Sequence, residues 1–257
     1  MNRLQGKVGV ITGGTSGFGF SIAQLFVQEG ATVVVAARKI EKGTHAVKKI
    51  KELTGVDVKF FPCDVSRENE VMDLVQKIID LYKKIEIWVN NAGILTRKDF
   101  EETTEKEWGE MMNTNLKGVF FCCKHVIPFM VKNGKGSIIN ISSHVSLIGK
   151  SDAPLYSASK GGVTALTRSL SLRYAKNNIR VNCICPGWII TDMNRDVIEK
   201  AEDPVKKLKE IVAHYPLGRL GTPVDVAYAA VYFASDESQW VTGVALPVDG
   251  GYIAGKE

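Results

Sequence analysis

Short apolar runs alternate with longer amphipathic stretches along nearly the whole chain, and this alternation restricts the possible folds more than any other feature of the sequence. The runs have the length of buried strands, and the stretches between them carry apolar residues at helical spacing. Strands of continuous apolar character that are separated by helices form a parallel sheet covered on both faces. We therefore predict an α/β fold with a doubly wound, mostly parallel, seven-stranded sheet of Rossmann type.

The predicted elements follow one another without a linker, repeat or low-complexity segment. Strands are predicted at residues 8–12, 32–36, 56–61, 85–89, 137–141, 179–184 and 243–248. Helices are predicted around residues 22–30, 41–53, 67–82, 105–115, 119–131, 156–175 and 223–234. A long, charge-rich piece between Pro186 and Pro216 has no such pattern, and long loops of this kind often cover functional sites. We predict one domain over residues 1–257, with a substrate lid around residues 188–216.

Composition and charge favour a globular protein without a nucleic-acid or membrane partner. Hydrophobic residues make up 45% of the chain, which is enough to bury a large core. The net charge of +5 comes from basic residues scattered over helices, and no nucleic-acid motif accompanies them. No apolar run is long enough for a membrane span or a signal peptide. The five cysteines include no C-x-x-C pair, so we expect no metal site, a reducing compartment and a cytoplasmic location.

A glycine-rich turn, residues 12–19, joins the first predicted strand to the first predicted helix. Its glycines allow a tight turn and the close approach of a pyrophosphate, and the N–H groups at the helix start favour negative charge. The spacing of Gly13, Gly17 and Gly19 is one residue longer than the common dinucleotide fingerprint. A glycine-rich turn without a ligand is the alternative, but the strand–turn–helix context favours a dinucleotide site.

The end of the second predicted strand bears on the choice of cofactor. In dinucleotide-binding folds an acidic residue here binds the 2′-hydroxyl of NAD, whereas a nearby Arg accommodates the 2′-phosphate of NADP. This chain has no acid at that place and carries Arg38 followed by Lys39. Arg38 as an ordinary exposed loop residue is the alternative. We favour NADP, with NAD as the second choice.

Tyr156 and Lys160 stand four residues apart in a predicted helix and therefore share a face. A free Tyr has a pKa of about 10, too high for a base near neutrality. A neighbouring ammonium, together with the positive ring of an oxidised nicotinamide, would lower that pKa. The pair is therefore a candidate acid–base device in which Tyr156 donates and accepts the proton.

The same Tyr-x-x-x-Lys spacing recurs at Tyr252 and Lys256, so the spacing alone is not specific. The second copy lies in a glycine-containing tail where a stable helix is not expected, and Gln239 stands thirteen residues before it. Upstream of Tyr156, by contrast, a predicted strand ends in Ser142 and Ser143. Ligands bind at the carboxyl ends of such strands, so Ser143 is a candidate partner of the substrate oxygen. Ser142 in that role, or both hydroxyls bound to loop backbone, are the alternatives.

With these motifs the sequence resembles the short-chain dehydrogenase/reductase family, in its compact single-domain branch. The resemblance covers nearly the whole chain, with the motifs in family order and at family spacing, including the thirteen residues from Ser143 to Tyr156. The matching segments are TGGTSGFG (12–19), CDV (63–65), NNAG (90–93), NTNLKGVF (113–120), ISS (141–143), YSASK (156–160), PGWIITDM (186–193) and VDGG (248–251).

The resemblance implies a catalytic tetrad of Asn115, Ser143, Tyr156 and Lys160. Tyr156 would be the acid–base group and Ser143 the partner of the substrate oxygen. Lys160 would bind the nicotinamide ribose and lower the pKa of Tyr156, and Asn115 would hold a water that links Lys160 to solvent.

The resemblance also implies a set of cofactor contacts along the whole crevice. Asp64 and Val65 would contact the adenine, Asn91 would lie on the ribose side, and Ile189 and Thr191 would hold the carboxamide and the pyrophosphate. Phe18 replaces the usual Ile or Leu, and Ser16 replaces a base found in many NADP-preferring members, which leaves Arg38 as the selecting cation. The full predicted set is Gly13, Thr15, Ser16, Gly17, Phe18, Gly19, Arg38, Asp64, Val65, Asn91, Ala92, Gly93, Tyr156, Lys160, Pro186, Gly187, Ile189 and Thr191.

The substrate is expected to be a small alcohol/carbonyl pair, such as a sugar acid, polyol or ketone. Ser143, His144 and Trp188 are its predicted contacts, although His144 as a locally bonded loop residue is an equal alternative. A reductase of 3-oxoacyl groups on acyl carrier protein is the alternative enzyme. Such relatives carry bases where this chain has Gly134 and Asn177, with Lys135 and Lys176 adjacent.

Two further expectations concern the class of protein and its assembly. A non-catalytic dinucleotide-binding regulator is the alternative outside enzymes, but such a protein is expected to have lost Tyr156 or Lys160, and this chain retains both. The family resemblance also implies a homotetramer.

Overall fold

The computed structural model describes residues 2–98, 100–191 and 194–255 and contains one seven-stranded sheet. Every pair of neighbouring strands is parallel, and the order is β3-β2-β1-β4-β5-β6-β7. The predicted fold class is confirmed. The strands are β1 (Val8–Thr12), β2 (Thr32–Ala37), β3 (Lys59–Pro62), β4 (Ile87–Asn90), β5 (Gly136–Ile141), β6 (Ile179–Pro186) and β7 (Ala245–Val248).

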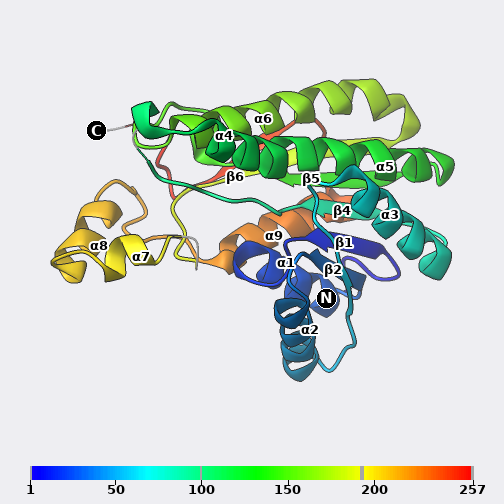
Figure 1. Ribbon diagram of the computed structural model, residues 1–257. Coiled ribbons are helices and arrows are strands. Elements are labelled where there is room, and N and C mark those ends of the chain that lie inside the picture. The colour runs from blue at the N-terminus through cyan, green and yellow to red at the C-terminus, as the bar shows by residue number, and fades with distance from the viewer. Residues whose placement is uncertain (1, 99, 192–193, 256–257) are drawn as a thin grey trace.

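Helices cover both faces of the sheet (Figure 1). One face carries α1 (Gly17–Gln28), α2 (Ile40–Thr54) and α9 (Pro223–Ala234), and the other carries α3 (Glu68–Tyr82), α4 (Glu105–Met112), α5 (Gly118–Lys132) and α6 (Pro154–Tyr174). Within the described ranges no helix is long and apolar enough to cross a bilayer.

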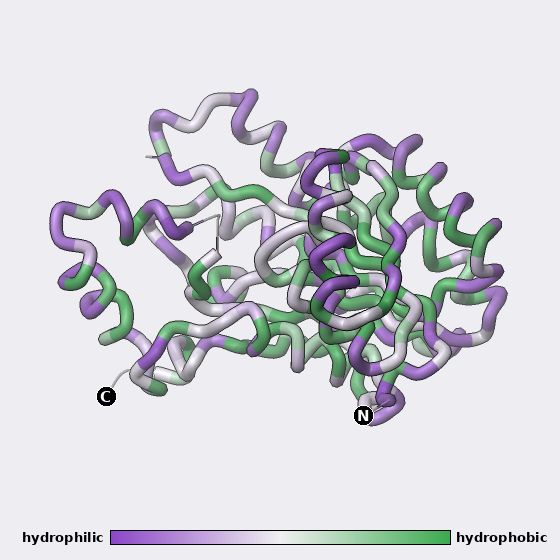
Figure 2. Tube along the Cα trace, turned by 90° about the horizontal axis from the view of Figure 1, so that it is seen from below, coloured by the Kyte–Doolittle hydropathy of each residue, from purple (hydrophilic) through white to green (hydrophobic). Residues whose placement is uncertain are grey.

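Each strand contributes alternate side chains to two separate hydrophobic cores. In β2, Val33 and Val35 pack with Phe26 of α1, whereas Val34 faces the opposite core with Trp88 of β4. Successive side chains of a strand point to opposite faces, so a strand buried on both sides must be apolar throughout. Along the helices apolar residues face inward and polar residues outward (Figure 2).

The third and seventh strands begin two or three residues later than predicted. Gly55 ends α2 with a φ of 75°, and the chain needs the residues after it to turn back toward the sheet. Gly243 likewise has a φ of 75°, which lies outside the strand region.

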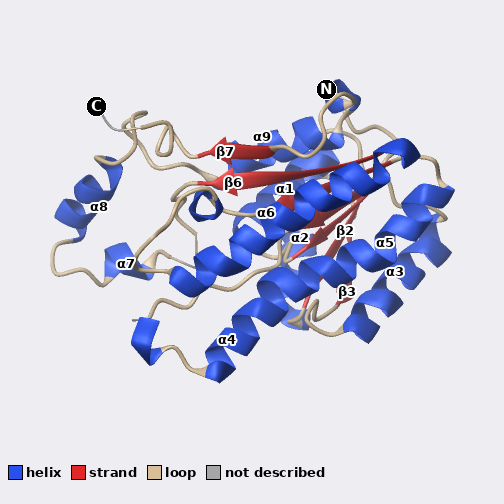
Figure 3. Ribbon diagram, turned by 90° about the horizontal axis from the view of Figure 1, so that it is seen from above, coloured by secondary structure: helices blue, strands red, loops and turns tan. Residues whose placement is uncertain are grey.

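The piece between Pro186 and Pro216, predicted as irregular, contains two short helices, α7 (Asp196–Glu199) and α8 (Pro204–Val212). The side chain of Asp203 accepts a hydrogen bond of 2.9 Å from the backbone N–H of Lys206 and Pro204 follows it, so the sequence carries a helix start here. Both helices project beyond the end toward which β6 and β7 point (Figure 3). The predicted lid is therefore partly helical, and its residues 192 and 193 lie outside the described residues.

Candidate active site

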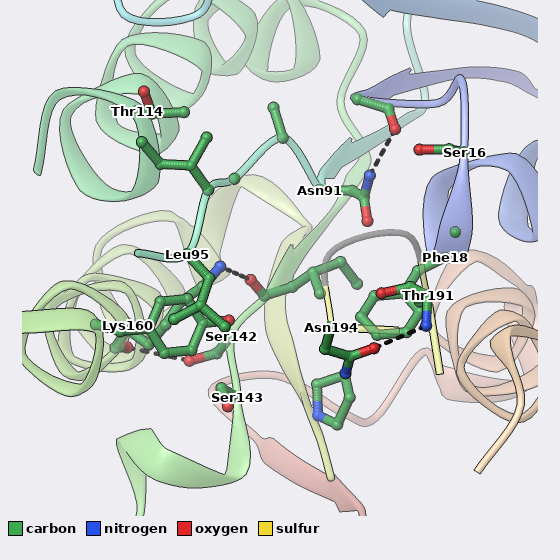
Figure 4. A pocket seen from close by; sticks show the side chains of 18 of the residues that line it. Ser16, Phe18, Asn91, Leu95, Thr114, Ser142, Ser143, Lys160, Thr191 and Asn194 are labelled. Atoms are coloured by element: carbon green, nitrogen blue, oxygen red, sulfur yellow. Dashed lines mark hydrogen bonds between the residues drawn. The ribbon is translucent and has the colours of Figure 1, made fainter. Parts of the chain in front are cut away.

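A cavity of about 480 Å³ opens along the carboxyl edge of the sheet, where ligands bind in doubly wound folds. Its walls come from the ends of β1 to β6 and the loops that follow them. All the predicted cofactor residues line it except Gly19, and so do the three predicted substrate residues Ser143, His144 and Trp188. Figure 4 shows Ser16 and Phe18 on one side of this cavity and Leu95, Ser143 and Lys160 across it.

The glycine-rich turn is shaped by close approach of backbone segments. Gly13 has a φ of 65°, and a Cβ there would stand 2.8 Å from the Ala92 Cα in the neighbouring loop. Gly17 has a φ of 53° at the start of α1. Only glycine adopts these angles without strain. The cradle therefore fits a pyrophosphate on backbone N–H groups at the start of a helix.

Gly19 and Asn91 support this cradle from behind. A Cβ on Gly19 would lie 2.4 Å from both the Asn91 Nδ2 and the Gly13 carbonyl oxygen, so the residue is required for packing and does not line the cavity. The Asn91 amide donates to the carbonyls of Thr12 (3.0 Å) and Gly13 (2.9 Å). Its side chain thus braces the loop, and its predicted contact on the ribose side remains a prediction.

The adenosine end of the cavity is basic. Arg38 and Lys39 line it, and so does Lys42, one turn into α2, which we did not predict from the sequence. The closeness of Lys42 to Arg38 and Lys39 in the sequence is the signal that identifies it. Asp64 lines the same cavity, and its Oδ1 accepts bonds from the Ser66 N–H (3.0 Å) and hydroxyl (2.7 Å).

The predicted proton-transfer residues converge at the other end. Ser143 follows β5, and Tyr156 and Lys160 lie on α6. The Lys160 Nζ is 5.7 Å from the centre of the Tyr156 ring and donates a hydrogen bond of 2.7 Å to the Ile141 carbonyl. The Ser143 hydroxyl lowers the pKa of the Tyr156 phenol. The three groups are thus assembled on two rigid elements around one cavity.

The structure also separates the two neighbouring serines. The Ser142 hydroxyl donates to the Lys160 carbonyl at 3.0 Å and lies 2.9 Å from the Thr164 hydroxyl, so its hydrogen bonds hold α6 to β5 (Figure 4). Within the described ranges, the Ser143 hydroxyl accepts a long hydrogen bond of 3.4 Å from the Val145 N–H. Ser143 is therefore the better placed of the two to meet a substrate oxygen.

Burial sets the protonation of Tyr156 and Lys160 in this structure. Desolvation raises the pKa of Tyr156 to about 12, and the Ser143 hydroxyl and the Arg97 charge offset part of the rise. The lowering expected from Lys160 together with an oxidised nicotinamide concerns the cofactor complex and stays a prediction. Desolvation lowers the pKa of Lys160 to about 8, which brings its proton into the range of neutral chemistry.

We expect Lys160→Met to stabilise the fold at pH 7 by about 1–3 kcal/mol. Lys160 is 4% exposed, and the difference between its ordinary pKa of 10.5 and about 8 corresponds to about 3 kcal/mol. The lost bond to the Ile141 carbonyl offsets part of this. Below pH 8 Lys160 is charged in both states, and the folded state bears the desolvation cost. From pH 8 to 10.5 the unfolded chain binds more protons at Lys160 than the folded protein does, so the free energy of unfolding of the wild type rises with pH. The difference in that free energy between wild type and Lys160→Met therefore shrinks.

Urea unfolding of both proteins at several pH values measures this effect. Lys106→Met, at a side chain that is 84% exposed on α4, is the matched control and should change the free energy of unfolding by less than about 0.5 kcal/mol. A Lys160→Met protein no more stable than wild type at pH 7 would contradict the prediction.

Asn115 occupies a π-helical turn (Asn113–Lys117) between α4 and α5 and is fully buried. Its Oδ1 accepts from the Ile94 N–H at 2.8 Å, and its Nδ2 donates to the Ile94 carbonyl at 2.9 Å. The side chain therefore fixes the loop after β4, and the residue does not line the cavity. Its predicted role in holding a relay water remains a prediction.

His144 and Trp188 line the cavity, but their hydrogen bonds differ. The His144 Nδ1 lies 2.9 Å from the Pro186 carbonyl and its ring contacts Tyr252, which fits the locally bonded alternative. Burial lowers the pKa of His144. The Trp188 Nε1 is buried and has no hydrogen-bond partner among the described residues.

Three further residues line the cavity: Arg97 and Lys150, which were not predicted from the sequence, and Asn194, which belongs to the lid predicted around residues 188–216. The Asn194 side chain accepts from the Thr191 N–H and donates to the Ile189 carbonyl, both at 2.9 Å, and so shapes the loop after β6 (Figure 4). All three stand in loops, where no periodic pattern marks a residue as facing a site.

The sequence and the fold of this chain are similar to those of known proteins that are named for more than one activity. A family model described as enoyl-(acyl carrier protein) reductase matches residues 13–253. The chain is 40% identical to the 3-oxoacyl-(acyl-carrier-protein) reductase of Chlamydia trachomatis over 96% of this chain and 98% of that protein. It is also 40% identical to the NADP-dependent (R)-specific alcohol dehydrogenase of Lentilactobacillus kefiri, over 98% and 99%. A solved structure from Burkholderia xenovorans, titled as a short-chain dehydrogenase/reductase, superposes with a TM-score of 0.95 at 32% identity and full coverage of both chains.

Proposed function

The chain belongs to the short-chain dehydrogenase/reductase family, and on that premise we propose that it is an NADP(H)-dependent oxidoreductase that interconverts a small carbonyl compound and its alcohol. The observation that carries the proposal is one continuous cavity with the phosphate cradle and Arg38 at one end and Ser143, Tyr156 and Lys160 at the other. A dinucleotide spans such a crevice in folds of this kind.

The residues at the catalytic end have separable roles in the proposed reaction. A bound nicotinamide supplies or accepts the hydride. Ser143 donates a hydrogen bond to the substrate oxygen and stabilises its developing negative charge. Tyr156, a phenol at neutral pH, gives its proton to that oxygen in the reductive direction. Lys160, with a pKa of about 8, is placed to replenish the proton.

Reduction is the direction that the resting protonation state favours. Tyr156 begins as a phenol, so carbonyl reduction needs no prior ionisation. Alcohol oxidation needs the phenolate, which a higher pH supplies. The regulatory alternative has no support in the site, because the groups that chemistry needs are present and converge on one cavity.

A second candidate substrate class is the 3-oxoacyl thioester. The 40% identity to a 3-oxoacyl-(acyl-carrier-protein) reductase favours it, whereas equal identity to an alcohol dehydrogenase favours a small free substrate. The structure gives little support for a docking site for an acyl carrier protein. Lys135, which stands beside one of the positions where such relatives carry a base, already forms an ion pair with the Glu86 carboxylate at 3.6 Å.

A carbonyl panel followed by loss of NADPH absorbance tests the proposal. The panel contains small ketones, sugar acids and an acetoacetyl thioester, each with NADPH and with NADH. We expect turnover of at least one class, with NADPH preferred. Cofactor binding without turnover on any class would support the regulatory alternative, and exclusive turnover of the thioester would select the second candidate.

The family resemblance also leads us to propose a cytoplasmic homotetramer. Large apolar side chains lie exposed on the helices of one face, at Trp108 (54%), Phe120 (50%) and Leu172 (82%). Exposed apolar area of this kind marks interaction surfaces. Light scattering of the purified protein measures the assembly directly.

A further inference from the structure

Two cations flank one indole ring at the substrate end of the cavity. The Arg97 guanidinium carbon and the Lys150 Nζ each lie 5.3 Å from the centre of the Trp188 ring. The three residues come from the loops after β4, β5 and β6, and all three line the cavity that holds Tyr156. They therefore form a single wall, the 97/150/188 wall.

The charges of this wall are largely uncompensated. Within the described part of the chain, Arg97 forms no ion pair or hydrogen bond. Lys150 has one carboxylate partner, Asp152, at 3.5 Å, and that side chain is 55% exposed. Counting Lys160, the described residues that line the catalytic end include three cations, Arg97, Lys150 and Lys160, and one carboxylate, Asp152. A cavity lined by an excess of one charge attracts a ligand of the opposite charge.

The wall and the reacting group share one cavity. Arg97, Lys150 and Trp188 line it together with Ser143 and Tyr156, and the positive charge of Arg97 lowers the pKa of that phenol. The buried Trp188 Nε1–H adds a donor without a partner among the described residues. Buried donors are normally satisfied, so this one invites a ligand or a water.

From these observations we propose that the 97/150/188 wall is a subsite for a carboxylate on the substrate, so that the enzyme acts on oxo acids rather than on neutral carbonyl compounds. The proposal rests on the proposed oxidoreductase function and specifies its substrate class. Arg97 presents the planar, multi-donor group that pairs best with a carboxylate, and Lys150 adds a point charge. With its carboxylate held there, an oxo acid directs its carbonyl toward Ser143 and Tyr156.

A purely structural explanation makes a different prediction. If the two cation–π contacts only hold the three loops together, their loss weakens the binding of all substrates alike and lowers the thermal stability of the protein. If the wall binds a carboxylate, their loss affects acids alone and acts mainly on KM.

Matched acid and ester substrates separate these possibilities. We would measure reduction of pyruvate, acetoacetate and levulinate against their methyl esters, which differ only in charge and one methyl group. The three acids place the carboxylate at increasing distance from the carbonyl. Any influence of Arg97 on the pKa of Tyr156 acts on acid and ester alike, so the ratio between the two substrates cancels it. Wild-type kcat/KM should favour at least one acid by about 10-fold or more, and the KM of that acid should rise with salt.

Arg97→Met should raise the KM of the preferred acid by roughly 10- to 100-fold and leave its ester within about 3-fold of wild type. Lys150→Met should do the same to a smaller extent because Asp152 already offsets its charge. Arg97→Lys should fall between wild type and Arg97→Met. Lys106→Met, which removes the same charge from an exposed site on α4, should change neither substrate.

Calorimetric binding of 3-hydroxybutyrate and its methyl ester to the NADPH complex gives a readout that needs no turnover. The acid should bind more tightly than the ester, and Arg97→Met should abolish the difference. The subsite would be overturned if the wild-type enzyme bound and reduced acids and esters equally well. It would also be overturned if Arg97→Met weakened the binding of the acid and of the ester to the same extent. Reduction of esters and neutral ketones without a preference for acids would overturn the subsite alone, whereas no reduction of any carbonyl would also remove the proposed function.

Discussion

Tyr156→Phe is expected to lower kcat for carbonyl reduction by about 10²- to 10⁴-fold, the usual contribution of a positioned general acid. The change removes one hydroxyl, and the ring can keep its place on α6 beside Lys160. NADPH binding should therefore stay within a few-fold of wild type, because the phosphate cradle and Arg38 lie at the other end of the cavity. Steady-state kinetics with the preferred substrate and a fluorescence titration with NADPH measure the two quantities separately.

Tyr174→Phe is the matched control for this experiment. Tyr174 is the last residue of the same helix, lies outside the cavity and uses its hydroxyl only for a contact of 3.3 Å with the Arg173 Nε. It should keep wild-type kcat. If Tyr156→Phe retained more than about a tenth of wild-type kcat, another group would have to donate the proton and the assignment would be wrong.

The fold was predictable because its pattern is local. The predicted bounds of β1 and α9 agree with the structure to the residue. Thr222 is the N-cap of α9, and it forms a capping box with Asp225 ahead of an apolar run. The third strand was misplaced because Gly55 takes a left-handed conformation that the apolar pattern does not reveal.

The convergence of the candidate catalytic residues Ser143, Tyr156 and Lys160 on one cavity was predictable because rigid elements carry them. Ser143 follows a strand and Tyr156 shares a helix with Lys160, so sequence spacing translates into distance. The second Tyr-x-x-x-Lys pattern behaves as expected: Tyr252 lies in turns after β7, against His144 and Tyr215, and its partner Lys256 lies outside the described residues.

The charged wall was not predictable from spacing. Arg97, Lys150 and Trp188 are separated by 53 and 38 residues and meet only because three strands end at the same edge of the sheet. The effect of burial on Tyr156 was not predictable from spacing either. Spacing placed Lys160 near the phenol, but only the packed structure shows that desolvation has the largest effect on the pKa of Tyr156.

Arg38→Asp is expected to lower the ratio of kcat/KM for NADPH to that for NADH by roughly 100-fold or more. Hydrogen bonds between charged groups contribute about 1.5–3 kcal/mol, which is a factor of about 10 to 100, and the new carboxylate also repels a 2′-phosphate. The same carboxylate can accept a hydrogen bond from the 2′-hydroxyl of NADH, so the efficiency with NADH should rise as that with NADPH falls.

The neighbouring bases limit the size of this change. Lys39 and Lys42 line the same end of the cavity and remain in the variant, so some preference for NADPH should survive and disappear when Lys42→Ala is added. Lys48→Asp makes the same change in net charge at a side chain on α2 that is 76% exposed and outside the cavity, and it should leave the ratio unchanged. An unchanged ratio in Arg38→Asp would mean that the cation after β2 does not select the cofactor. Selection would then have to come from Lys39 and Lys42, the bases that remain at that end of the cavity.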